Sequence, residues 1–197
     1  MSEGRSGLDR VKAGEPFFMP DPELIGLLIS ASSLAAQYNA TFPTDPGAGK
    51  AILKRLFGKY EESSFVIPSL TTEFGFNTEI GAETLVNKNC TLMDCFRITI
   101  GNRVQLAPSV LLLTGGHAPR AADRWTTDVY GLPGTYTTGA PIVIEDEVWI
   151  GAGALVLPGV TIGARTTVGA GSVVTKSLPS DVVAAGNPCR VIRQLER

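Results

Sequence analysis

The stretch PIVIEDEVWIGAGALVLPGVTIGARTTVGAGSVVTK, residues 141–176, repeats every six residues. Two rows of apolar or small residues run through it without a gap, the second row two positions ahead of the first. The first row is Ile144, Ile150, Val156, Ile162, Val168 and Val174, and the second is Ile142, Val148, Ala154, Val160, Thr166 and Ser172. A period of six matches neither the 3.6 residues of a helix turn nor the two-residue alternation of a half-buried strand. We interpret each hexad as one short strand and one turn.

Three such hexads make one coil of a prism, with about eighteen residues per coil. The row residues of successive coils then stack into an apolar column, as in solenoids generally. Small residues after many of the anchors suit tight corners, because glycine adopts backbone angles that side chains resist. The same spacing recurs upstream in Ile80, Val86 and Leu92 and, after a slip of two, in Ile100, Leu106 and Leu112. The sequence predicts a mainly β protein whose parallel β-helix spans residues 61–187.

Residues 1–60 precede the repeat and read as a tail followed by helices. Asp21 is a typical helix N-cap and Pro22 suits the first helical position, which predicts a helix from about Pro22 to Tyr38. The stretch GAGKAILKRLFGKY, residues 47–60, carries a second amphipathic pattern. Both helices are expected to pack on the end or side of the prism. Residues 188–197 are expected to be a C-terminal tail or short helix.

The rhythm breaks over residues 113–141, where 32 positions separate Leu112 from Ile144. A long irregular segment in a compact repeat is usually functional, with disorder as the competing explanation. Trp125, Tyr130 and Tyr136 favour an ordered lid over a flexible linker. His117, the single histidine of the chain, stands at the first bend of this segment. A lone histidine is most often a polar side chain with a structural partner, so its neighbourhood decides its interpretation.

Composition excludes several classes of protein. The formal net charge of −2 indicates no binding surface for nucleic acid or an anionic membrane. The apolar run LIGLLI, residues 24–29, is too short to span a bilayer, and the polar N-terminus does not read as a secretory signal. Cys90, Cys95 and Cys189 are odd in number and lack CxxC spacing, which argues against disulfides and a zinc site. We therefore expect a cytoplasmic protein without a metal.

Several stretches together resemble the sugar O-acetyltransferases of the hexapeptide-repeat superfamily, the maltose, galactoside and nodulation acetyltransferases. They are KAGEPF, QYNATFP, FGFNTEIGAETLVNKNCTLMD, ITIGNRVQLAPSVLLLTGGHAPR and the segment from Ala140 to Arg193. The resemblance covers nearly the whole chain and is most specific in the last segment. It implies a homotrimer of left-handed β-helices, with the acetyl-CoA groove and the active site between neighbouring subunits.

The resemblance also implies roles for individual residues. His117 falls on the catalytic histidine, and an imidazole, with an ordinary pKa near 6.5, suits a general base. Asn87 matches an asparagine at the reaction centre. Substrate-binding positions are Glu73 and Asp94, to which we add Tyr136 from the long segment. The residues expected to contact the cofactor are Trp149, Ala152, Ala170, Thr175, Lys176, Arg190 and Arg193. For Arg190 and Arg193 the alternative is a solvated basic tail.

The chain departs from this family where the acceptor binds. Relatives carry an aspartate and arginine in the first helix, whereas FFMPDPELIGLLISAS contains no arginine and displaces the aspartate to Asp21. An alanine also separates His117 from the following proline, and the loop is longer than in the family. We expect an acceptor more apolar than a sugar.

The leading interpretation is an acetyl-CoA-dependent O-acetyltransferase in which the acceptor hydroxyl attacks directly, without an acyl-enzyme. Cys90 and Cys95 are alternative nucleophiles, but neither has a second imidazole to activate it. A non-catalytic trimeric scaffold or CoA-binding module is the second interpretation. A metal-dependent enzyme of the carbonic anhydrase type is the third, and it would need several histidine ligands.

Overall fold

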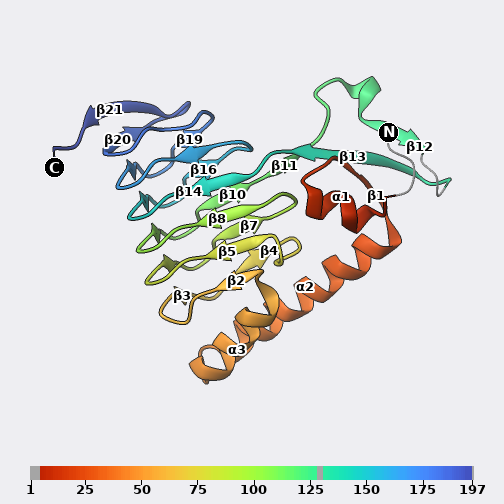
Figure 1. Ribbon diagram of the computed structural model, residues 1–197, viewed down its shortest axis with the longest axis horizontal. Helices are drawn as coiled ribbons and strands as arrows, with labels where there is room; N and C mark the ends of the chain where they lie inside the picture. Colours follow the sequence, from red (N-terminus) through yellow and green to blue (C-terminus); the bar gives the residue numbers. More distant parts are fainter. Residues whose placement is uncertain (1–4, 128–130, 197) are drawn as a thin grey trace.

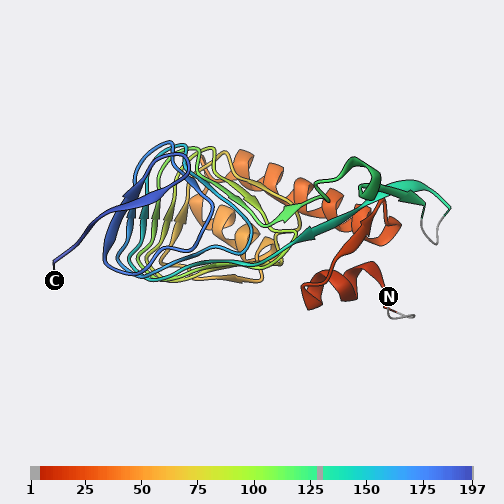
Figure 2. The same ribbon diagram turned by 90° about the horizontal axis from the view of Figure 1, so that it is seen from above.

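The structure is a computed structural model that describes residues 5–127 and 131–196 of the chain. Stacked coils form a prism with three sheet faces (Figures 1 and 2). The first face contains β2 (Lys59–Tyr60), β5 (Thr78–Ile80), β8 (Ile98–Ile100), β14 (Ile142–Ile144) and β17 (Thr161–Ile162). The second contains β3 (Phe65–Val66), β6 (Leu85–Val86), β9 (Gln105–Leu106), β15 (Trp149–Ile150), β18 (Thr167–Val168), β20 (Val182–Ala185) and β21 (Arg190–Gln194). The third contains β4 (Thr71–Thr72), β7 (Thr91–Met93), β10 (Leu111–Leu113), β16 (Leu155–Val156) and β19 (Val173–Val174).

The two rows predicted from the repeat of six form the interior of the prism. Every member of both rows is at most 2% exposed. The two hydroxyls among them find main-chain acceptors, as buried polar groups must. Thr166 donates to the carbonyl of Pro179 at 2.7 Å and Ser172 to that of Gly169 at 2.6 Å. The prediction of a parallel β-helix with these residues as its core is confirmed.

All irregularities of the repeat lie on the third edge of the prism, where the chain turns from the third face to the first. In the later coils Ile144 pairs with Ile162, eighteen residues further on. In the earlier coils Ile80 pairs with Ile100, twenty residues further on, because the corners at residues 73–77 and 94–97 are wider. The segment 113–141 leaves and re-enters at this same edge. The slip of two in the sequence is therefore a widened corner.

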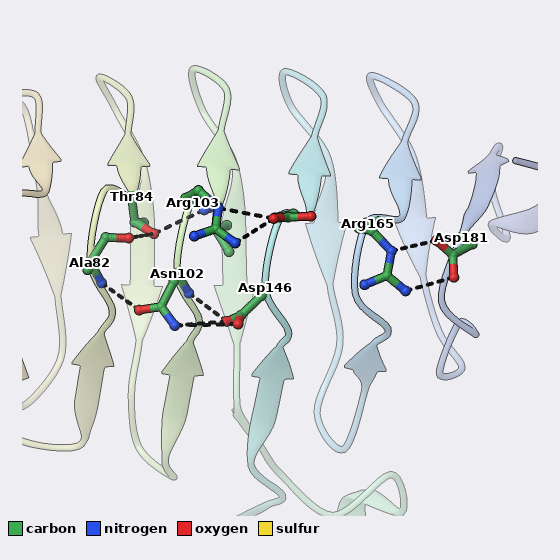
Figure 3. A network of polar contacts seen from close by, with 9 residues as sticks. Ala82, Thr84, Asn102, Arg103, Asp146, Arg165 and Asp181 are labelled. Atoms are coloured by element: carbon green, nitrogen blue, oxygen red, sulfur yellow. Dashed lines mark hydrogen bonds and ion pairs between the residues drawn. The ribbon is translucent and has the colours of Figure 1, made fainter. Parts of the chain in front are cut away.

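The first edge, between the first and second faces, carries a ladder of charged residues. Its corner residues adopt left-handed backbone angles, with φ between 53° and 61°, although none is glycine: Glu83, Arg103, Glu147, Arg165 and Asp181. Glycine was expected at such corners, since the left-handed conformation costs any other residue about 1–2 kcal/mol of conformational free energy. Their charges alternate along the stack. Arg103 bonds Glu147, and Arg165 forms two bonds of 2.6 and 2.8 Å to Asp181 (Figure 3).

The N-terminal segment forms three helices, α1 (Gly7–Ala13), α2 (Pro22–Thr41) and α3 (Pro46–Leu56). Helix α2 begins where it was predicted, with the Asp21 carboxylate accepting from the N–H groups of Glu23 and Leu24 at 2.9 and 3.1 Å. It extends three residues beyond the predicted end, and α1 was not predicted. The amide of Asn39 ties α2 to the first coil, because it bonds both the N–H and the carbonyl of Leu70.

The excursion over residues 113–141 contains regular strands where an irregular loop was expected. Its elements are β11 (Gly115–Gly116), a 3₁₀ turn at Ala121–Asp123, β12 (Trp125–Thr127) and β13 (Pro133–Gly139). Strand β13 pairs antiparallel with β11 and β12, and with β1 (Phe17–Met19) from the N-terminal segment. This small sheet projects away from the prism (Figure 2). Tyr130, named above as an ordering aromatic, lies outside the described residues.

The C-terminal segment is a strand, so the alternative of a short helix is wrong. Strand β21 pairs antiparallel with β20, in contrast to the parallel pairing of the coils. The main-chain pairing ends the second face with a strand that reverses direction. Among the described residues, no helix is long and apolar enough to cross a membrane.

Removing a row residue should destabilise the whole stack. Ile162 has no exposed surface, and Ile162→Ala is expected to lower the free energy of unfolding by about 2–5 kcal/mol through the cavity it leaves. Urea denaturation followed by circular dichroism measures the loss. Thr161→Ala, one residue earlier on the outward side of the strand, is the matched control and should change stability by about 0.5 kcal/mol or less. Equal losses for the two variants would contradict the assignment of inward and outward positions.

Candidate active site

His117 is an exposed side chain that a main-chain carbonyl orients. Pairing of β11 with β13 brings the bend after Gly116 beside Tyr136, and His117 Nδ1 lies 3.2 Å from the Tyr136 carbonyl oxygen. A carbonyl can only accept a hydrogen bond, so Nδ1 must carry the proton in this contact. In the neutral ring Nε2 then keeps its lone pair and can take a proton from another molecule.

Asn87 lies on the second edge, where the chain turns from the second face to the third. Its N–H donates to the Leu106 carbonyl in the next coil at 3.0 Å, and its Oδ1 accepts from the N–H of Lys88 at 2.8 Å. The Nδ2 amide donates no hydrogen bond within the described residues. The side chain is half-buried, and its Oδ1 contact orients the amide so that Nδ2 can donate to another molecule.

Three predicted cofactor contacts extend from the same edge. Ala152 and Ala170 occupy equivalent corners of successive coils and are exposed, and the Gly171 N–H donates to the Ala152 carbonyl. Their own N–H groups donate no hydrogen bond in the described part of the chain. Trp149, 53% exposed, precedes them on the second face. A row of small side chains with unused N–H donors beside an exposed indole fits an elongated ligand that carries amide carbonyls.

The predicted site residues fall into two groups that one chain keeps apart. The second-face group comprises Asn87, Trp149, Ala152, Ala170, Arg190 and Arg193. The third-edge group comprises Glu73, Asp94, His117, Tyr136, Thr175 and Lys176. Asn87 lies before β7 and His117 after β10, so the full width of the third face separates them. A site that uses both residues therefore needs the second-face group of another copy.

The cationic residues among these predictions are exposed. Arg190 and Arg193 lie on β21, and Arg190 donates from Nη1 to the Cys189 carbonyl at 2.8 Å. Lys176 and Thr175 directly follow β19. The arginines thus lie on a strand that pairs with the second face and whose residues are all exposed.

Asp94 occupies a place that does not fit its expected contact with acceptor hydroxyls. Its side chain is fully buried, and its carboxylate accepts from the Thr72 hydroxyl and from four main-chain N–H groups in the corner at residues 73–77. Burial raises the pKa of Asp94, and the N–H donors act in the opposite direction. The structure assigns this carboxylate to holding the widened corner. Sequence comparison alone cannot show that a matching acid is buried.

Glu73, in that corner, is half-buried and remains accessible. Burial and the nearby Asp94 carboxylate raise the pKa of Glu73. Its neighbour Cys95 is 6% exposed, and burial, followed by the charges of Glu73 and Asp94, raises the pKa of the Cys95 thiol to about 12. Burial also raises the pKa of Cys90. Neither thiol is placed to act as a nucleophile.

The residue that orients His117 is one that sequence reasoning missed in this role. Tyr136 was expected to bind substrate with its side chain, whereas its carbonyl holds the imidazole and its ring packs edge-on against Phe18 at 5.5 Å. A main-chain carbonyl leaves no signature in the sequence. A cavity lined by Arg165, Asp181, Leu195 and Glu196 lies on the first edge, beside the end of β21. Among the described residues, no three His, Cys, Asp or Glu side chains are grouped to hold a metal ion.

Comparisons with known proteins agree with this architecture. Residues 141–176 match the model of bacterial transferase hexapeptide repeats, and residues 10–61 match the maltose acetyltransferase hexapeptide capping motif. The galactoside O-acetyltransferase of Escherichia coli is 35% identical over 192 residues, covering 95% of this chain and 88% of its own. This chain belongs to the hexapeptide-repeat acetyltransferases.

Solved structures of hexapeptide-repeat acetyltransferases are closely similar over the whole chain. A maltose O-acetyltransferase from Clostridium difficile superposes with a TM-score of 0.88 at 33% identity, covering 98% of this chain and 99% of its own. A hexapeptide-repeat acetyltransferase from Vibrio cholerae, solved in complex with acetyl coenzyme A, gives a TM-score of 0.87 at 35% identity and covers 98% and 100%. The similarity includes the helical segment as well as the prism.

The orientation of His117 predicts its tautomer. When the imidazole ring is neutral, Nδ1 should carry the proton and Nε2 the lone pair, because the Tyr136 carbonyl accepts a hydrogen bond from Nδ1. Nitrogen-15 NMR of the imidazole measures this directly, since the chain has one histidine and the signals need no assignment. The unfolded protein in urea is the control. A folded protein with the proton on Nε2 would contradict the contact.

Proposed function

We propose that this acetyltransferase transfers an acetyl group from acetyl-CoA to a hydroxyl of a small-molecule acceptor, with His117 as general base. The observation that carries the proposal is the hydrogen bond from Nδ1 to the Tyr136 carbonyl, which leaves Nε2 of the neutral ring with its lone pair. A hydroxyl is a very weak acid, so it needs a base that removes its proton as it attacks. The exposure of His117 leaves Nε2 accessible to such a hydroxyl.

The acceptor then attacks the thioester directly, by addition and elimination, and no acyl-enzyme forms. The acceptor oxygen forms a bond to the thioester carbonyl carbon while its proton moves to Nε2. The tetrahedral intermediate collapses with cleavage of the carbon–sulfur bond, and the proton on Nε2 passes to the departing thiolate. The products are the acetyl ester and free CoA. Asn87, through its Nδ2 donor, stabilises the negative charge on the oxygen of the intermediate.

The active site is composed of two chains of a homotrimer. His117 and Asn87 lie on different edges of one prism, so they meet only when the third edge of one subunit faces the second edge of its neighbour. A cyclic arrangement of three prisms repeats this contact three times and closes. Each trimer therefore holds three equivalent sites.

Residues of the second-face group bind acetyl-CoA. The N–H groups of Ala152 and Ala170 donate to the amide carbonyls of the pantetheine arm, and the Trp149 indole packs along it. Arg190 and Arg193, with Lys176, pair with the phosphates, where guanidinium groups form two parallel hydrogen bonds. Thr175 completes the contact on the third edge. Acetyl-CoA supplies the activated acyl group, and the chain supplies the base and the orientation.

The acceptor is more apolar than a sugar. Asp21 is buried as the cap of α2, so it offers no contact to sugar hydroxyls, and α2 contains no arginine. Ile25 and Ile29 on this helix are 38% and 66% exposed, and Trp125 on β12 is 68% exposed. A sugar hydroxyl buried without a partner costs about 1–3 kcal/mol, whereas apolar walls favour an apolar ligand. A terpenoid, polyketide or peptide-like alcohol fits this chemistry, with Glu73 receiving its hydroxyl.

Replacing the base should abolish turnover and leave cofactor binding intact. His117→Ala is expected to lower kcat by about 10²- to 10⁴-fold, while the Kd for acetyl-CoA changes less than about twofold, because His117 is not among the residues proposed to contact the cofactor. Release of free thiol measures the rate, and calorimetry measures binding. Thr126→Ala, an exposed position on β12 of the same excursion, is the control. An active His117→Ala enzyme would favour the scaffold interpretation.

Mixing two inactive variants should restore activity if each site spans two chains. His117→Ala and Asn87→Ala subunits are unfolded together in equal amounts and refolded into mixed trimers. A site is intact when one neighbour keeps His117 and the other keeps Asn87, which random assembly gives in about a quarter of the sites. The mixture should show about a quarter of the parental rate. Light scattering checks the trimeric mass, and a mixture as inactive as its components would place both residues in one chain.

The acceptor class is tested by comparing kcat/KM across alcohols. Apolar alcohols such as a monoterpenol are expected to exceed maltose, glucose and galactosides by about 10-fold or more, since each unpaired sugar hydroxyl weakens binding. Ile29→Arg should lower the value for the apolar alcohol and leave acetyl-CoA binding unchanged. If a simple sugar has the highest kcat/KM, the exposed residues of α2 serve only packing between subunits.

A further inference from the structure

Thr114 is a fully buried polar residue at the point where the excursion leaves the prism. Its side chain has no exposed surface. The hydroxyl donates to the Met93 carbonyl at 2.6 Å and accepts from the Phe96 N–H at 2.9 Å. Both partners belong to the widened corner at residues 94–97 and its flank, one coil earlier. A single hydroxyl thus bridges the two sides of that corner.

The main chain of Thr114 closes the base of the excursion. Its N–H donates to the Met93 carbonyl at 3.1 Å, and its carbonyl accepts from the N–H of Ala140 at 3.1 Å. Ala140 is the residue at which the chain returns to the prism. The outgoing and returning segments are therefore joined at Thr114, three residues before His117.

The backbone is closely packed around this junction, with no room for a side chain at Gly115 or Gly139. A Cβ added to Gly115 would lie 2.9 Å from Cys95 Sγ, and one added to Gly139 would lie 2.0 Å from the Thr114 carbonyl oxygen. Such distances are below van der Waals contact. The corner under Thr114 is itself fixed, because the buried Asp94 carboxylate bonds the preceding corner. Two successive buried polar residues thus tie three coils together at the third edge.

We propose that Thr114 is a positioning residue for catalysis, whose hydroxyl sets the direction in which β11 carries His117 away from the prism. The inference rests on the proposed role of His117 as the base. Thr114 does not touch the reacting atoms. It acts through the corner at residues 94–97, which supports β11, and through β13, which presents the Tyr136 carbonyl. A base must lie within hydrogen-bonding reach of the proton it removes, so a small displacement of this strand reduces the rate.

The hydroxyl has a role that packing alone would not require. Replacement by valine keeps the shape of the side chain and leaves the Met93 carbonyl bonded to the Thr114 N–H. The Phe96 N–H then loses its acceptor in a buried place, and the corner must move to satisfy it. Replacement by serine keeps both hydrogen bonds and removes only a methyl group. The pair Thr114→Val and Thr114→Ser therefore separates hydrogen bonding from volume.

The experiment measures kcat, KM for acetyl-CoA and the imidazole nitrogen-15 signals in both variants. Thr114→Val is expected to lower kcat by about 10- to 100-fold, the effect of a misplaced base, with KM for acetyl-CoA within about twofold. Thr114→Ser should recover kcat to within about threefold. In Thr114→Val the His117 signals should move toward those of a solvent-exposed, unbonded imidazole, and in Thr114→Ser they should stay. Thr126→Val, an exposed threonine of the same excursion, is the matched control.

Two results would overturn the proposal. One is a Thr114→Val enzyme with parental kcat, and the other is a loss that serine shares equally, which would indicate a purely volumetric effect. If Thr114→Val fails to fold, circular dichroism detects it and the serine variant with its NMR signals carries the test. The NMR comparison needs no turnover. A parent protein without acetyl transfer would therefore end the proposed function while the effect of Thr114 on His117 remained measurable.

Discussion

Register between successive coils is the constraint on which this molecule depends. From β2 to β19, each strand of the prism is only two or three residues long and could not form alone, but it lies parallel on its counterparts in the neighbouring coils. The buried rows make this register costly to change, because a shift by one residue would turn every apolar side chain outward. The spacing of six on the first and second edges follows from that requirement. Only one edge is released from it.

Function is built where the register permits variation. The third edge receives the two widened corners and the whole excursion, so His117, Glu73 and Thr114 gather there. The second edge keeps its strict spacing and offers repeated small residues with unused N–H groups at Ala152 and Ala170. In the proposed trimer, the variable edge that carries the base of one subunit faces the regular edge that binds acetyl-CoA in its neighbour.

The sequence was sufficient for the parts of the fold that repeat. The rows from Ile144 to Val174 predicted the interior, and Asp21 with Pro22 predicted the start of α2. It was insufficient where partners are distant or polar. Strand β13 is rich in threonine and glycine, and its partner β1 lies more than a hundred residues earlier, so local pattern could not reveal the pairing. The bend at His117 could be predicted from the sequence, whereas the carbonyl that orients its ring depends on the pairing of β11 with β13, and the burial of Asp94 depends on the corner at residues 73–77.

The alternating charges on the first edge affect the order in which the coils can stack. The first interior row, from Ile144 to Val174, consists only of isoleucine and valine, so this row would accept a structure in which one coil is looped out or exchanged with a second chain. Omitting a coil would place Arg103 beside Arg165, or Glu83 beside Glu147, at neighbouring left-handed corners. Like charges in contact oppose such pairings, while opposite charges favour the native one. The alternating charges thus favour the native order of the coils over an order in which one coil is omitted. Hydrophobic packing of the interior does not make that distinction.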